Sequence, residues 1–221
     1  MSAQPSLEGV VDDVVSSILG EDHATDWDAF EQFSELVHRL FVVPSTTITP
    51  AMRRFFYALG VALSPTSVLA VGSYVGYATI WFCGDPSWMD GARSLRCVDP
   101  DPVANRIARR NFEAIGLASW SVVDGTGLAS TGDDGTDTPD LVYVDLDDPV
   151  DRKAGYAPIC DALLTRPEPP ATIVAHDMTA QPFLVDADIL RSTLDASPAA
   201  HRSWFLPLDD SGVAVIRSGA S

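Results

Sequence analysis

The chain has 221 residues, of which 46% are hydrophobic and 20% charged, enough apolar content for one folded domain and too much for wholesale disorder. Its 31 acidic and 14 basic residues give a net charge of −17, which disfavours binding to nucleic acid or to anionic membrane surfaces. Residues 1–8 lack the pattern of a secretion signal, and no window has the roughly 20 apolar residues of a membrane span. We therefore expect a soluble, cytoplasmic protein with no nucleic-acid or membrane partner.

Two helical patterns precede the first predicted strand. Apolar residues fit a short amphipathic helix over Val10–Leu19, and they recur every three or four positions over Trp27–Leu40. Thr49-Pro50 then supplies an N-cap and a proline at the first helical position, so a further helix is expected from there. We divide the chain into an N-terminal helical extension, residues 1–45, which is either a lid or a dimer contact, and a main domain, residues 46–221.

Short apolar runs alternate with helical patterns along the main domain. The first five runs are Ser67–Val71, Leu95–Val98, Trp120–Val123, Leu141–Val144 and Thr172–Ala175. Two further runs, Trp204–Leu206 and Val213–Ile216, flank the turn residues 209–212 and predict a terminal hairpin. This alternation predicts an α/β fold: a doubly wound, Rossmann-like, mostly parallel seven-stranded sheet with a C-terminal antiparallel hairpin and extra N-terminal helices.

Helical patterns fill most of the gaps between the runs. One opens at Gly76, one runs from Asp101 to Gly116, one includes Ile159–Leu164, and one spans Ala187–Leu194. The stretch from Gly125 to Pro139 is rich in Gly, Thr and Asp and poor in apolar residues, so we expect a loop there.

Glycines and polar residues stand where the predicted strands end. Ligands bind at this edge of an open α/β sheet, because loops and helix N-termini converge there. Gly72 and Gly76 would let backbone approach a ligand, although ordinary turn glycines give the same pattern. Asp99 is placed to accept both hydroxyls of a ribose, or else to cap the following helix. The other candidates at strand ends are Asp124 to Thr126, Asp145, His176 and Asp177.

Taken together, four segments resemble the class I S-adenosylmethionine-dependent methyltransferases, and more narrowly the cation-dependent catechol and caffeoyl-CoA O-methyltransferase group. The segments are Val68–Tyr77, Asp99–Pro102, Asp140–Asp145 and Ala175–Asp177. The likeness extends from about Thr46 to Arg217. It implies S-adenosylmethionine as the cofactor, a small-molecule substrate and a homodimer.

The resemblance also implies which residues hold the cofactor. Residues Gly72, Ser73, Tyr74 and Gly76 would pass beneath its methionine part, Asp99 would hold the ribose, and Gly125-Thr126 would border the adenine. Pro100 and Asp145 complete this predicted cofactor set.

The positions that hold a metal in the family are Asp145, His176 and Asp177 in this chain. Two carboxylates and an imidazole suit a divalent ion, and the imidazole shifts the preference from Mg²⁺ toward Mn²⁺, Fe²⁺ or Zn²⁺. The alternative is that His176 only caps a strand end and that Asp177 acts without a metal.

The chain departs from the family pattern at the catalytic lysine. The family's lysine stands three residues after the first metal ligand, and that position here is Asp148, while the only lysine, Lys153, lies farther along the loop. Asp148 could act as a general base, since neighbouring carboxylates raise its pKa, or it could belong to a solvated acidic loop. We therefore take Asp145, Asp148 and His176 as the candidate catalytic residues.

Three functions follow from these features. The first is methyl transfer from S-adenosylmethionine to the oxygen of a small hydroxylated metabolite, in specialised metabolism. The second uses the cofactor as its own substrate, in a cyclisation such as 1-aminocyclopropane-1-carboxylate formation that releases methylthioadenosine. It is suggested by three departures from the family pattern, which are Asp148 and, near the cofactor, Ala70 and Ala78. The third is a non-catalytic relative, which the retained glycine turn and Asp99 argue against.

Overall fold

The computed structural model describes residues 5–44, 48–126, 138–147 and 152–219. A seven-stranded sheet runs through the molecule in the order β3-β2-β1-β4-β5-β7-β6. Its strands are β1 Ser67–Val71, β2 Ser94–Asp99, β3 Trp120–Asp124, β4 Leu141–Val144, β5 Thr172–His176, β6 His201–Leu206 and β7 Val213–Ser218. Strands β1 to β5 pair in parallel, and β7 lies antiparallel to both β5 and β6. The predicted mixed sheet and terminal hairpin are confirmed.

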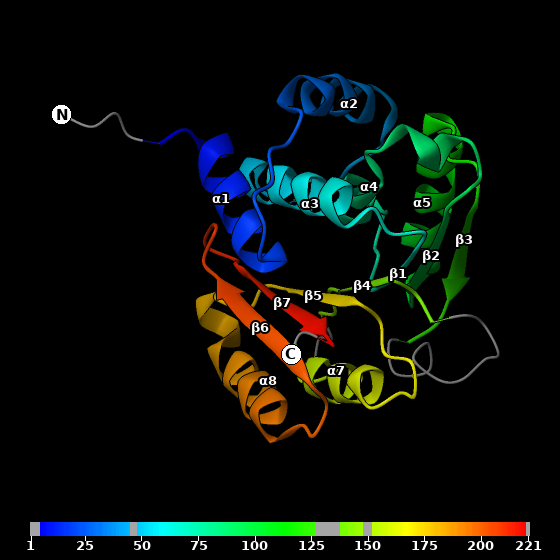
Figure 1. Cartoon of the computed structure of the whole chain (residues 1–221). Coiled ribbons are helices and arrows are strands. Elements are labelled where there is room, and N and C mark those ends of the chain that lie inside the picture. The colour runs from blue at the N-terminus through cyan, green and yellow to red at the C-terminus, as the bar shows by residue number, and fades with distance from the viewer. Residues whose placement is uncertain (1–4, 45–47, 127–137, 148–151, 220–221) are drawn as a thin grey trace.

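Helices cover both faces of the sheet (Figure 1). Helices α1, α3, α4 and α5 lie on one face, with α2 outside α3, and α7 and α8 lie on the other. The α-helices are α1 Leu7–Leu19, α2 Trp27–Leu40, α3 Pro50–Leu63, α4 Tyr77–Ile80, α5 Pro102–Ile115, α7 Tyr156–Leu164 and α8 Leu184–Ala196. Short 3₁₀ turns occupy Trp81–Cys83, Pro86–Met89 and Gln181–Phe183.

Helix starts follow the predicted caps. The Thr49 side chain accepts a hydrogen bond from the Met52 amide at the start of α3, and Asp101 does the same for Val103 at the start of α5. The helix expected from Gly76 differs from the prediction, because it becomes 3₁₀ after one turn. In this region the Phe82 backbone packs so closely on Gly60 of α3 that a Cβ on Gly60 would lie 2.6 Å from the Phe82 carbonyl oxygen.

The core consists of two layers, one on each face of the sheet, because successive strand residues point to opposite faces. In β1, Val68 and Ala70 face the layer built with α1, α2, α3 and α5, whereas Leu69 and Val71 face α7 and α8. The N-terminal helices share the first layer through the following buried residues: Val11, Val15 and Ile18 of α1, and Phe30, Phe33 and Val37 of α2. Phe55 and Phe56 of α3 are fully buried in the same layer.

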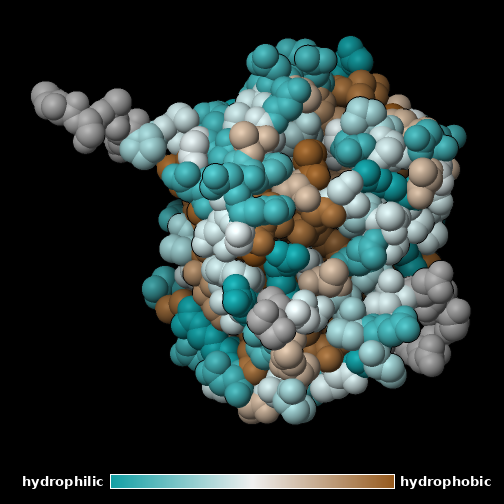
Figure 2. Space-filling model, in the orientation of Figure 1, coloured by the Kyte–Doolittle hydropathy of each residue, from teal (hydrophilic) through white to brown (hydrophobic). Residues whose placement is uncertain are grey.

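On the face of the molecule shown in Figure 2, hydrophilic residues dominate the edge and hydrophobic residues gather toward the centre. No helix within the described ranges combines the length and apolar character needed to span a bilayer. Most of the stretch predicted as a loop, residues 127–137, lies outside the described residues.

Candidate active site

A cavity of about 860 Å³ opens at the carboxyl ends of β1, β2, β4 and β5. Strands β2 and β3 lie on one side of β1, and β4 and β5 lie on the other, so the strand order reverses at β1. The cavity lies at this point of reversal, which is the usual ligand site of this architecture. Nine of the residues predicted for the site line it: Gly72, Ser73, Tyr74, Asp99, Pro100, Thr126, Asp145, His176 and Asp177.

The turn after β1 depends on Gly72. Its φ of +77° falls in the left-handed region, and a Cβ there would lie 2.1 Å from the backbone oxygen of Asp145. A side chain would therefore push apart the ends of β1 and β4. Tyr74 also has a positive φ, 48°, and this turn directs its amide at the Asp99 carboxylate.

Asp99 is held in place by backbone amides. Its Oδ2 accepts from the Tyr74 amide at 2.7 Å and its Oδ1 from the Asp101 amide at 2.9 Å. Burial raises the pKa of Asp99, against the lowering effect of these two bonds, and the charges of Asp101 and Asp145 raise it further. Each oxygen of an ionised carboxylate has a second lone pair, so Asp99 can still accept from two ligand hydroxyls.

Two glycines of the predicted cofactor set, Gly76 and Gly125, are not among the described residues that line the cavity. Gly76 instead permits close packing, since a Cβ there would lie 2.3 Å from the ring of Phe112 on α5. Gly72 therefore lies at the cavity, whereas Gly76 allows the turn to pack closely against Phe112 of α5.

The three predicted metal ligands come together at the ends of β4 and β5. Ligand atoms of Asp145, His176 and Asp177 all lie within 4.8 Å of one another. His176 Nδ1 is 3.3 Å from Asp145 Oδ2 and 3.5 Å from Asp177 Oδ1. Its other nitrogen, Nε2, is buried and has no hydrogen-bond partner among the described residues.

The sequence prediction missed a fourth member of this cluster, Lys153. Its ammonium lies 2.9 Å from Asp145 Oδ1 and 2.9 Å from Asp177 Oδ2, and its side chain is 1% exposed. The prediction placed this residue too far along the loop to matter, although a single lysine amid so many carboxylates was a usable signal. Asp148, the predicted replacement for the family's lysine, lies outside the described residues.

Asp145 is surrounded by donors. Besides Lys153, the Tyr143 hydroxyl donates to Oδ2 at 3.0 Å, and the Tyr156 hydroxyl lies 3.4 Å from Oδ1. Burial by itself would raise the pKa of Asp145, but His176 and Lys153 hold it well below its ordinary value. The two carboxylates in turn raise the pKa of Lys153 and of His176, against the lowering effect of burial.

By chemical type, this donor set suits a divalent ion. The arrangement does not, because the Lys153 ammonium already lies against both carboxylates and would repel a second cation at contact distance. The residues as they are arranged hold an ammonium ion in the place that a metal would need.

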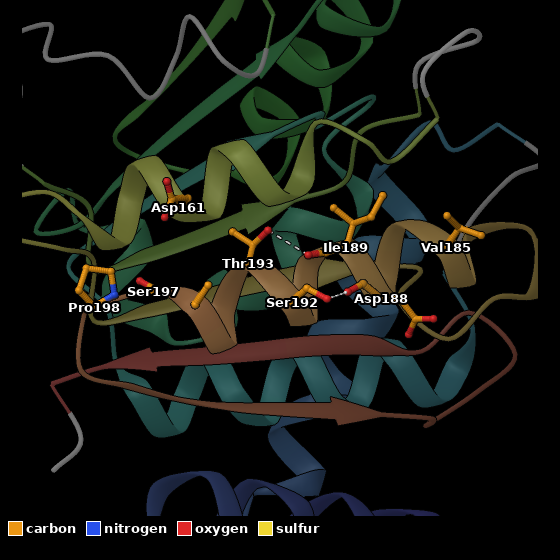
Figure 3. Close-up of a pocket in the computed structure, with 9 residues that line it drawn as sticks. Asp161, Val185, Asp188, Ile189, Ser192, Thr193, Ser197 and Pro198 are labelled. Carbon is orange, nitrogen blue, oxygen red and sulfur yellow. Dashed lines mark hydrogen bonds between the residues drawn. The ribbon is translucent and has the colours of Figure 1, made fainter.

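A second groove, of about 620 Å³, runs along α8 on the far side of the sheet (Figure 3). Its walls come from α8, the residues that follow it and Asp161 of α7. None of the described residues at the strand ends lines it, and the Ser192 and Thr193 hydroxyls are already hydrogen-bonded to backbone carbonyls of the same helix. We therefore place the candidate site in the cavity at the strand ends.

Comparison with known proteins identifies the fold. No family model matches the chain, and no curated protein matches its sequence. Among solved structures, a Podospora anserina methyltransferase bound to S-adenosylhomocysteine is 18% identical, with a TM-score of 0.66 and 100% of each chain covered. A Bacillus cereus O-methyltransferase is 19% identical, with a TM-score of 0.61 and coverage of 95% of this chain and 97% of its own.

A third similar structure is an O-methyltransferase of tomaymycin synthesis from Streptomyces achromogenes, solved with S-adenosylmethionine. It is 17% identical, with a TM-score of 0.62, and the match covers 96% of each chain. These likenesses span nearly the whole chain, so the class I methyltransferase fold predicted from the sequence is confirmed.

Proposed function

We propose that this protein is an S-adenosylmethionine-dependent methyltransferase that methylates an oxygen of a small hydroxylated metabolite. The observation that carries the proposal is the Gly72–Tyr74 turn, which fixes the buried Asp99 beside a cavity at the reversal of strand order. The solved structures of the same fold that bind S-adenosylmethionine or S-adenosylhomocysteine support this assignment.

In the proposed complex, Asp99 accepts hydrogen bonds from the two ribose hydroxyls, and the Gly72 turn passes beneath the methionine part. Thr126 and Pro100 line the same cavity and would border the nucleoside. The methyl group would then face the end of β4, where Asp145, Lys153 and His176 gather. Positioning of this kind supplies a large part of the catalysis in methyl transfer.

The transfer itself is an in-line displacement. The acceptor oxygen forms a bond to the methyl carbon, the carbon–sulfur bond breaks, and S-adenosylhomocysteine leaves. The hydroxyl proton goes to a base, and we assign that role to His176, which lines the cavity. No described residue is a partner for its Nε2, and its Nδ1 faces two carboxylates. Asp145 orients the imidazole and stabilises its protonated form, as a carboxylate does in other acid–base pairs.

Mass spectrometry of the purified protein with S-adenosylmethionine tests the proposal, first alone and then with a panel of phenolic and hydroxylated metabolites. We expect cofactor binding, and S-adenosylhomocysteine only when a suitable acceptor is present. Methylthioadenosine formed without any acceptor would instead establish cyclisation of the cofactor. Absence of cofactor binding in calorimetry at micromolar concentrations would reject both enzyme functions.

We also propose a homodimer that serves specialised metabolism, on the basis of the sequence resemblance and the lysine-poor composition. Sedimentation velocity tests the first part, because a monomer at 23.7 kDa and a dimer separate clearly.

A further inference from the structure

Lys153 is the single lysine of the chain and one of its most buried side chains. Lysine is among the residues least often buried, and when buried it is paired. Here the ammonium has two carboxylates at 2.9 Å, and the rings of Tyr156 and Phe183 lie 5.3 and 5.1 Å from it. This environment of paired carboxylates and aromatic rings is built around one positive charge.

The backbone on both sides of this ion pair is in an unfavourable conformation. Arg152, directly before the lysine, has a φ of 51°, and Asp177 has a φ of 62°. Residues with side chains rarely adopt this left-handed region, so it persists only where the surrounding structure enforces it. The fold thus enforces a strained backbone on each side of the contact between the Lys153 ammonium and the Asp177 carboxylate.

The carboxylate of Asp145 has little capacity left for a metal. Its Oδ1 faces Lys153 and Tyr156, and its Oδ2 faces Tyr143 and His176. A divalent ion that took these oxygens would displace the ammonium and leave a buried lysine without its counter-charge, which is strongly unfavourable.

We propose that the Lys153 ammonium is the resident cation of this site and takes the place of a divalent metal ion, so that the protein works without one. Lys153 also lines the cavity, so its charge can stabilise the oxyanion that an acceptor hydroxyl becomes as its proton leaves. This catalytic meaning rests on the proposed methyl transfer, whereas the exclusion of metal does not.

The single lysine makes a direct test possible, because isotope-labelled lysine gives one side-chain signal in NMR spectra. A Mn²⁺ ion held by Asp145 and Asp177 would lie a few ångströms away and would broaden that signal. We expect one equivalent of Mn²⁺ to leave the wild-type signal unchanged and to give no binding heat in calorimetry. Loss of the signal at one equivalent would overturn the proposal.

Variants of Lys153 test whether its ammonium excludes the metal ion. Removal of the ammonium in Lys153→Ala should free both carboxylates and raise Mn²⁺ affinity by about tenfold or more, the range typical of changes around metal ligands. The double variant Lys153→Ala/Asp177→Asn is the matched control and should lose this gain. A folded Lys153→Ala that binds no Mn²⁺, or a double variant that binds it equally well, would overturn the proposal.

Lys153→Met, which keeps the length of the side chain, replaces Lys153→Ala if the latter does not fold, and the wild-type titration decides the question without any variant. Calorimetry with S-adenosylmethionine on the same wild-type sample reports separately on the proposed function. A protein that binds neither the cofactor nor Mn²⁺ would refute methyl transfer but leave the cation assignment intact. Where methyl transfer is observed, exhaustive chelation should not reduce its rate, and a loss of activity that metal restores would overturn the proposal.

Discussion

Two aspartates at neighbouring strand ends, Asp99 after β2 and Asp145 after β4, are held in contrasting ways. Asp99 accepts hydrogen bonds from backbone amides of two adjacent turns and forms no salt bridge within the part of the chain that the structure describes. Asp145 is held by three side chains: Tyr143 of β4, His176 of β5, and the Lys153 ammonium from the loop before α7. The pKa values move accordingly, upward for the buried Asp99 and downward for Asp145.

The two halves of the cavity are built differently. The half around Gly72 and Asp99, proposed to bind the cofactor and called the cofactor half, is fixed by the chain geometry of its turns, because backbone amides belong to a turn whatever side chains it carries. The half around Asp145, Lys153 and His176, proposed to bind the acceptor and called the acceptor half, depends on side chains that meet only because β4, β5 and the loop before α7 fold together. Substitutions in the first half should therefore change affinity, and those in the second should change stability and chemistry.

The largest effect is expected where the two halves touch. Gly72→Ala would place a Cβ against the Asp145 backbone in a left-handed residue, and it should destabilise the protein by about 4 kcal/mol. Urea unfolding measures this. Gly116→Ala is the matched control, because φ is +79° there and no atom lies within 4 Å of the added Cβ, so only about 1 kcal/mol is expected. Equal losses would show that the close contact between β1 and β4 is unimportant.

A smaller loss of stability is expected in the acceptor half. Asp145→Asn leaves the buried ammonium with one carboxylate and should cost about 3 kcal/mol of unfolding free energy. The control is Asp147→Asn, because the Asp147 side chain is 60% exposed and its ion pair with Arg152, at 3.7 Å, lies at the surface. This change should alter the free energy of unfolding by no more than about 0.5 kcal/mol. If both variants unfold alike, the Asp145 ion pair contributes no more than a surface pair.

The cofactor half should respond in affinity. Asp99→Ala removes the acceptor proposed for the ribose and should weaken S-adenosylmethionine binding by about 1 to 3 kcal/mol, roughly 5- to 150-fold, in calorimetry. Asp26→Ala, which removes the N-cap of α2 and does not line the cavity, should keep the affinity while costing about 1 kcal/mol of stability. Unchanged affinity in the Asp99 variant would place the ribose elsewhere.

The smallest effect concerns a third aspartate, Asp140, at the opposite end of β4, which accepts from the Thr66 amide and hydroxyl at 2.7 and 2.6 Å. Partial burial would raise the pKa of Asp140, but these bonds lower it below 3.8. Its stabilising contribution, about 1 kcal/mol or less at this partly buried site, is therefore present above the unfolded-state pKa and lost as the pH falls through the folded-state pKa.

Urea unfolding between about pH 5 and pH 3 should accordingly show a smaller acid destabilisation for Asp140→Asn than for the wild type. Identical pH profiles would mean that hydroxyl and amide donors alone do not hold a carboxylate ionised here. That result would strengthen the contrast between Asp99, which accepts from backbone amides, and Asp145, which has the Lys153 ammonium beside it.

The strands, most helix starts and the fold class could be predicted from the sequence alone, and so could the residues of the proposed cofactor half. Alternating apolar runs specify buried strands through local periodicity, and Thr49 and Asp101 cap helices within three residues of themselves. Gly72 likewise shapes its turn locally, and Asp99 accepts from the nearby Asp101 amide and from the Tyr74 amide in the turn after the neighbouring strand β1.

The arrangement of the acceptor half could not be predicted from the sequence, because Lys153 joins its cluster only in the folded chain. Lys153 lies eight residues after Asp145 in the sequence, and its ammonium reaches the two carboxylates only because Arg152 adopts a left-handed conformation and β5 brings Asp177 alongside. The 3₁₀ turn after α4 likewise accompanies close packing on Gly60, a residue of another helix. Sequence patterns record what the chain does within a few residues. The position of a flexible lysine side chain is set instead by charges that folding brings together from distant segments.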